Sequence, residues 1–124
     1  FRAYVFNPLT RALRKGRLKM NPALIILIGQ LATMTLIGLW HGLTWNFALW
    51  GVWHAVGLFV HNRWVSFLNV RRDRIHPAFH TSRAMRTLSL VLTFNFVALG
   101  WVWFALPSVQ MSWEILIRMF GGYR

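Results

Sequence analysis

Acidic side chains are almost absent from this sequence: two Asp and Glu residues stand against 14 Lys and Arg, which gives a formal net charge of +12. Charged residues of both signs make up 13% of the chain, about half of the roughly 25% found in soluble domains. Hydrophobic residues make up 56%, and the mean hydropathy is +0.45. So little polar surface does not cover a water-soluble globule, and the composition therefore indicates a protein of the lipid bilayer.

Cysteine is also absent, which excludes both a disulfide framework and a thiolate metal site. The charge-free part of the chain offers two well-placed histidines, His41 and His54, and no carboxylate. An ordinary zinc site needs three or four ligands, so we expect no bound metal. Because no acid lies near either histidine in the sequence, a serine-type triad is not expected either.

Basic residues are gathered in two segments. Six precede the first long apolar run, six more lie between the second and third runs, and residues 20–62 contain no Lys, Arg, Asp or Glu. Charge restricted to connectors is the positive-inside pattern of a membrane protein, so both basic segments are expected to face the cytoplasm. The expected partner of these side chains is the bilayer, and nucleic acid is not expected.

The apolar runs predict an all-α integral membrane fold with about three transmembrane helices and interfacial amphipathic helices at both ends. The chain does not begin with Met, and we expect it to be one fragment of a multi-span membrane domain. In order, the predicted parts are a basic interfacial segment at 1–20, spans at 22–40 and 45–60, a basic connector at 61–87, a third span at 88–106 and an amphipathic tail at 108–124.

The second predicted span is the unusual one. Its 16 residues would extend about 24 Å as a helix, short of a hydrocarbon core of roughly 30 Å. Two glycines and a threonine interrupt the apolar sequence between Gly38 and Trp45. We therefore expect a short or broken helix there, inside the membrane, where irregular backbone persists only if it is buried in protein or lines a cavity.

Histidine is costly inside a membrane, and an ionisable residue there is a functional hypothesis by default. His41 lies between Trp40 and Gly42. An apolar, indole-lined pocket disfavours the imidazolium ion, and a neutral imidazole can act as a general base on a hydroxyl. A structural histidine, hydrogen-bonded to a neighbouring helix, explains His41 equally well at this point.

His54 has a helical setting that favours packing. It belongs to a stripe with spacings of four and three residues, and a glycine in that stripe allows close helix contact. In one continuous helix His41 and His54 would lie about 220° apart, so a break must reorient one of them if they act together. The stripe consists of Trp50, His54, Gly57, His61 and Trp64.

Two consecutive blocks of sequence resemble the membrane-bound O-acyltransferase family, and most closely its bacterial branch of alginate O-acetyltransferases and teichoic acid D-alanyl transferases. Shorter matches at both ends of the chain keep the family's order and correspond to its C-terminal core. The two blocks are Gly38-Leu39-Trp40-His41-Gly42-Leu43-Thr44-Trp45-Asn46-Phe47 and Leu49-Trp50-Gly51-Val52-Trp53-His54-Ala55.

The resemblance implies an enzyme that transfers an acyl group to a hydroxyl of a polysaccharide or similar acceptor. His41 matches the family's catalytic histidine, and His54 matches a supporting one. The donor would be acyl-CoA or an acyl-carrier thioester, with no tightly bound cofactor, and the location would be the bacterial cytoplasmic membrane. The implied substrate tunnel is lined by Trp40, Gly42, Trp45 and Trp50.

The sequence departs from the family pattern at three positions: Ala3 replaces an aspartate, Ala55 a glycine and Ala105 an arginine. The family also carries further spans, so we expect this stretch alone to be inactive and to require the remainder of its polypeptide or a larger complex. The alternative is a non-catalytic membrane subunit, either a degenerate acyltransferase or one with His41 or His54 as a haem or chlorophyll ligand.

Overall fold

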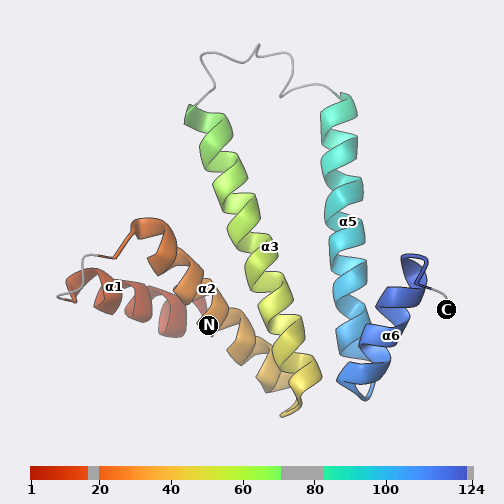
Figure 1. Cartoon of the computed structure of the whole chain (residues 1–124). Helices are drawn as coiled ribbons and strands as arrows, with labels where there is room; N and C mark the ends of the chain where they lie inside the picture. The colour runs from red at the N-terminus through yellow and green to blue at the C-terminus, as the bar shows by residue number, and fades with distance from the viewer. Residues whose placement is uncertain (17–19, 71–82, 123–124) are drawn as a thin grey trace.

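The computed structural model describes residues 1–16, 20–70 and 83–122, and every regular element among them is a helix (Figure 1). The all-α class is therefore confirmed. The elements are a π-helical turn, η1 (Arg2–Phe6), which continues into α1 (Asn7–Lys15), followed by α2 (Pro22–His41), α3 (Trp45–Val70), α5 (Arg83–Ala105) and α6 (Val109–Met119).

Two of the described helices are long and apolar enough to cross a bilayer. Helix α2 has 20 residues and a mean hydropathy of 2.0, and α5 has 23 residues and a mean hydropathy of 1.8. Only 11% of the apolar stretch of α5 is buried within the chain, so most of its hydrophobic surface is left for lipid or other protein. These are the features of a membrane protein.

Helix α3 is longer than the predicted second span. It continues to Val70, ten residues past the predicted end, because polar residues after Val60 do not by themselves end a helix and no Gly or Pro follows until position 77. With histidines, asparagines and an arginine spread along it, α3 is not among the helices apolar enough to count as a span. Helix α5 starts at Arg83, five residues early, and residues 71–82 of the predicted connector lie outside the described residues.

The interruption between α2 and α3 is a tight reversal rather than a long broken stretch. Asn21 caps α2 by accepting a hydrogen bond from the Ala23 N–H at 2.9 Å, and the helix then runs without a break to His41. Only residues 42–44 are non-helical before α3 starts at Trp45. Figure 1 shows α2 and α3 joined at this reversal, with the opposite end of α3 far from it.

Glycines set how closely α2 and α3 approach. A Cβ on Gly38 would meet the backbone carbonyl of Phe47, and a Cβ on Gly51 would lie 2.7 Å from the Cα of Thr35. Both glycines are buried. The two helices are thus in backbone-to-backbone contact, the close packing that small residues allow in membranes.

Replacing Gly51 by alanine is therefore expected to destabilise the α2–α3 pair by about 1–3 kcal/mol, the usual cost of overpacking. Backbone atoms, unlike a flexible side chain, have no easy way to move aside. Thermal unfolding of the full-length protein in detergent measures the effect. Gly16→Ala is the matched control, because a Cβ there comes no closer than 3.5 Å to its neighbours; equal unfolding temperatures for the two variants would contradict the close contact.

Helix α5 packs on α3 through aromatic side chains. The Trp53 indole N–H donates to the Phe96 carbonyl at 3.0 Å, and the two rings stack with centroids 4.9 Å apart. The Phe96 ring also lies directly against Gly57, the glycine expected to allow close packing. These contacts hold α5 beside α3 along the stretch that leads to the α2–α3 reversal.

The two ends of the chain are helical, as expected, and α1 is amphipathic. In α1 the basic side chains are exposed, whereas Leu9 and Leu13 are half-buried, and Thr10 packs with Phe6 against Gly29 of α2. In α6 the carboxylate of Glu114 accepts a hydrogen bond from Gln110 at 3.3 Å.

Candidate active site

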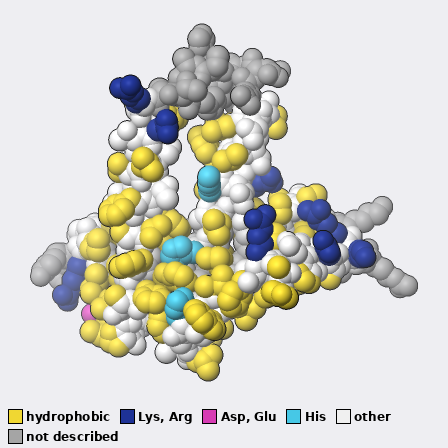
Figure 2. Space-filling model, turned by 180° about the vertical axis from the view of Figure 1, so that it is seen from behind, with side chains coloured by type: hydrophobic (Ala, Val, Ile, Leu, Met, Phe, Trp, Pro, Cys, Tyr) yellow, Lys and Arg dark blue, Asp and Glu magenta, His cyan; other side chains and the backbone are white. Residues whose placement is uncertain are grey.

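His41 is the last residue of α2 and is exposed at the reversal. Its imidazole is surrounded on one side by aromatic rings from three helices, and the other side is open. Figure 2 shows histidine side chains set among hydrophobic ones on the face that it displays. The centroid distances from His41 are 5.2 Å to Trp40, 6.5 Å to Phe47, 5.8 Å to Trp50 and 5.3 Å to Phe104.

Gly42 allows Phe47 to reach His41. The backbone at Gly42 is extended, with φ 172° and ψ 143°, a conformation open to any residue. A Cβ there, however, would lie 2.6 Å from Cδ2 of the Phe47 ring. Phe47 in turn meets Phe104 edge to face at 4.9 Å, so the glycine makes space for the aromatic wall beside the imidazole.

His54 and His41 each contact the Trp50 indole, and no direct contact joins the two imidazoles in the described part of the chain. The Trp50 ring is 5.8 Å from His41 and 4.5 Å from His54. The Nδ1 of His54 lies 2.9 Å from the Trp50 carbonyl. Since a carbonyl only accepts, this nitrogen carries the hydrogen, and in the neutral ring Nε2 is then the basic nitrogen.

Trp50 has a polar group without a partner. Its indole Nε1 is fully buried and has no hydrogen-bond acceptor among the described residues. Nearly all buried polar groups in folded proteins find a partner, so this buried N–H is an unsatisfied donor within the described part of the chain. Trp50 contacts both predicted histidines through its ring.

Asn46 and Ser112, which the sequence reading did not select, fix the far wall of the site. Asn46 is 4% exposed and Ser112 is completely buried. The Asn46 side-chain amide donates to the Leu106 carbonyl at 2.7 Å and lies 3.4 Å from Ser112 Oγ. Carbonyls at a helix end have no partner within the helix, so Asn46 joins the start of α3 to the end of α5, two residues from Phe104.

The remaining predicted site residues and the three departures from the family pattern differ in their exposure. Trp40 contacts the His41 ring but is 73% exposed, and Trp45 is 80% exposed, with no ring contact to His41 in the described part of the chain. Of the three departures from the family pattern, Ala55 is fully buried, whereas Ala3 and Ala105 are exposed. Trp45 therefore stands at the edge of the site.

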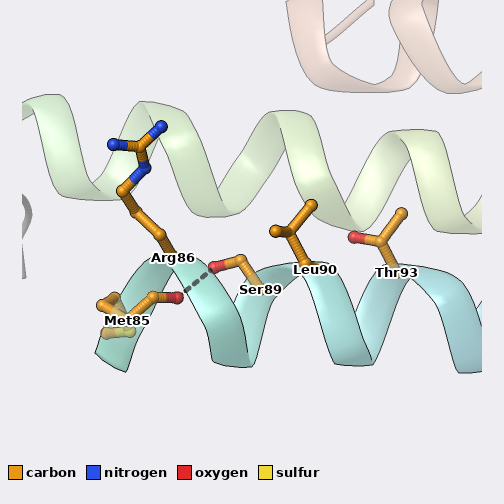
Figure 3. Close-up of a pocket in the computed structure, with 5 residues that line it drawn as sticks. All are labelled: Met85, Arg86, Ser89, Leu90 and Thr93. Atoms are coloured by element: carbon orange, nitrogen blue, oxygen red, sulfur yellow. Dashed lines mark hydrogen bonds between the residues drawn. The ribbon is translucent and has the colours of Figure 1, made fainter. Parts of the chain in front are cut away.

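A cavity of about 340 Å³ on α5 is separate from this site. Figure 3 shows that its lining side chains all project from one helix, and Ser89 there donates to the Met85 carbonyl at 2.9 Å. Neither histidine of the site lines it, so it has no part in the proposed chemistry. Its lining residues are Met85, Arg86, Ser89, Leu90 and Thr93.

Three curated relatives show which known proteins this chain resembles in sequence. A probable alginate O-acetylase of Azotobacter vinelandii is 36% identical over 89 residues, which cover 72% of this chain and 15% of that protein. A peptidoglycan O-acetyltransferase of Helicobacter pylori is 32% identical over 101 residues, 82% of this chain and 16% of that protein. A teichoic acid D-alanyltransferase of Streptococcus thermophilus is 26% identical over 109 residues, 85% of this chain and 26% of that protein.

The apolar helices are those of a membrane protein, and these relatives are named as acyltransferases. The relatives are members of the membrane-bound O-acyltransferase family, and the chain is homologous to a part of them. It spans only about 15–26% of the length of these relatives. No protein-family model matches the sequence, and no solved structure matches the fold.

Proposed function

We propose that this chain carries the catalytic histidine of an enzyme that moves an acyl group from a thioester donor to a hydroxyl of a polysaccharide or similar cell-envelope acceptor. The observation that carries the proposal is the setting of His41, an imidazole open on one side and walled by four aromatic rings on the other. The relatives are named for transfer of acetyl or D-alanyl groups, which supports this class of reaction.

His41 acts as the general base in this scheme. Its imidazole takes the proton of the acceptor hydroxyl as that oxygen attacks the thioester carbonyl carbon, the carbon–sulfur bond breaks, and the proton passes to the departing thiolate. The donor is acyl-CoA or an acyl-carrier thioester. The aromatic wall keeps water from the carbonyl and so suppresses hydrolysis of the donor.

His54 has a supporting role that works through Trp50. It does not share a proton with His41, because no direct contact joins the two rings in the described part of the chain. Its hydrogen bond to the Trp50 carbonyl and its ring contact position the indole, whose ring packs against His41. Trp40, Gly42 and Trp50 line the passage to His41, and Trp45 lies at its mouth.

A pigment-binding subunit is the less favoured function. The His54 ring already packs against Phe96, with centroids 6.0 Å apart, and a Cβ on Gly100 would lie 2.8 Å from its Cε1. Protein therefore occupies the space beside this imidazole, where a flat macrocycle would need to lie.

The proposed location is the bacterial cytoplasmic membrane, with His41 toward its outer side. Arg63 and Arg83 lie near those ends of α3 and α5 that are distant from the α2–α3 reversal (Figure 1). If basic ends face the cytoplasm, the reversal and His41 face the side on which envelope polysaccharides are modified. The remainder of the polypeptide or a partner subunit would close the open side of the site.

Deletion of the gene in its host tests the proposal. Ester-linked acyl groups on the acceptor polysaccharide, released by mild alkali and quantified by mass spectrometry, are expected to be lost, because the deletion removes the catalyst that forms them. Complementation with the full-length gene should restore them. An unchanged ester content in every envelope polymer would contradict the proposed function.

A further inference from the structure

A second cavity, of about 410 Å³, opens where the N-terminal helices meet α2 and α3. It is distant from the candidate active site: Ile26, which lines it, precedes His41 by 15 residues of α2, about 22 Å along the helix axis. Three separate helical segments contribute its walls. The lining residues are Phe6, Thr10, Arg14, Ile26, Phe59, Asn62, Arg63, Val65 and Ser66.

The cavity combines two cations with an apolar floor. Arg14 comes from α1 and Arg63 from α3, and both are exposed. The only acid among the described residues, Glu114, lies on α6, so no carboxylate in this part of the chain compensates the two guanidinium groups. Two arginines from different helices with no acid between them favour an anion that accepts several hydrogen bonds, such as a phosphate.

The hydroxyl groups that line the cavity have their hydrogens already engaged. Thr10 Oγ1 donates to the Phe6 carbonyl at 2.8 Å, and Ser66 Oγ donates to the Asn62 carbonyl at 2.8 Å. The remaining donors among the lining side chains are the two guanidinium groups and the Asn62 amide. Phe6, Ile26 and Phe59 supply an apolar surface below them, which a soluble phosphate would leave uncovered.

We propose that this cavity is a binding site for one anionic phospholipid. Its phosphate lies between Arg14 and Arg63, and the first part of an acyl chain covers the apolar floor. The site lies at the basic ends of helices whose hydrophobic stretches begin just beyond it, which is the depth of the headgroups. The proposal goes beyond acyl transfer and does not depend on it, since no residue of the His41 site takes part.

Lipid titrations followed by native mass spectrometry of the full-length protein in detergent test the site, with phosphatidylglycerol as the probe and phosphatidylcholine as the neutral lipid. Wild type is expected to bind one phosphatidylglycerol with clear preference. A basic residue near the surface is worth about fivefold in affinity, so the Arg14→Gln/Arg63→Gln variant should lose roughly 10- to 25-fold. Equal binding of the two lipids by wild type would overturn the proposal.

The matched control is Arg11→Gln/Arg118→Gln, which removes the same two charges from exposed positions on α1 and α6 that do not line the cavity. It should lose less than about twofold, since charges outside the contact are screened by salt. An equal loss in the control and the test variant would show diffuse attraction without a site, and would overturn the proposal.

A steric variant keeps both arginines and fills the space. Ser66→Trp places an indole in the cavity from the exposed face of α3, and it should weaken phosphatidylglycerol binding about as much as loss of the arginines. Competition with inorganic phosphate distinguishes a site for a phospholipid headgroup from a site for free phosphate. Displacement of the lipid by millimolar phosphate would identify a soluble phosphate site and overturn the lipid assignment.

Discussion

Replacing His41 by alanine in the full-length protein is expected to lower kcat for acyl transfer by about 10²- to 10⁴-fold, the usual contribution of a general base. The side chain stands at the end of α2 and is exposed, so its removal should cost little stability. Purified protein in detergent, supplied with a radiolabelled thioester donor and a polysaccharide acceptor, gives the rate, and thermal unfolding of the same sample reports the fold.

His61→Ala is the matched control for this experiment. His61 is also an exposed histidine, and it lies on α3 sixteen residues beyond its start at Trp45, far from the aromatic wall. Its replacement should leave kcat within about twofold of wild type, as for most surface substitutions. Retained transfer by the His41→Ala protein would remove this residue from the chemistry, whereas equal losses in both variants would point to a general effect on folding.

Much of the fold follows from the sequence because it depends on local signals. Asn21 and Pro22 start α2 where expected, since a capping side chain and a proline suit the first turn. The apolar run after them has only Gly38 and Gly42 near its end, and the reversal falls there. Helix α3 is longer than the span predicted at 45–60, because a helix can leave the apolar layer and continue with exposed polar side chains.

The candidate site was predictable in part. The motif around His41 identified the residue itself, but not its surroundings, because those come from distant parts of the chain. Phe104 is 63 positions away from His41 and still meets it at 5.3 Å. Periodicity within one helix gives no information about contacts with another. The sequence does contain one signal for these surroundings: Asn46 is an uncharged polar residue in an apolar stretch, and such a residue in a membrane is expected to have a partner.

The relation between the two histidines also required the structure. Angular spacing along an ideal helix placed them on different faces, and the reversal at residues 42–44 does reorient them. It brings both into contact with one indole instead of into contact with each other. That arrangement makes Trp50 the element that couples them, and it assigns His54 to positioning and not to proton transfer.

Replacing Asn46 by leucine is expected to lower kcat by roughly 10- to 100-fold, because a displacement of about 1 Å at a reacting site can cost as much as 10²-fold. The substitution removes the hydrogen bond to the Leu106 carbonyl, which is 2.7 Å long, and leaves that carbonyl unpaired, at a cost of about 1–3 kcal/mol. The end of α5 then loses its attachment to α3, and Phe104 no longer holds the His41 ring. Rates and unfolding temperatures of the purified full-length protein measure the two effects.

Asn95→Leu provides the control with the same chemical change. Asn95 is exposed on α5 and donates to the Val91 carbonyl of its own helix at 2.8 Å, so its loss disturbs no contact between helices. Ser112→Ala should have an intermediate effect, because Ser112 Oγ is the weaker partner of Asn46, at 3.4 Å. If Asn46 positions the aromatic wall, the fall in kcat should be largest for Asn46→Leu, smaller for Ser112→Ala and smallest for Asn95→Leu. The KM for the donor should change little in all three variants. Equal kcat values for Asn46→Leu and Asn95→Leu would show that the hydrogen bond between α3 and α5 does not hold the aromatic wall. The alignment of His41 would then come from the packing of Phe47 and Trp50 alone.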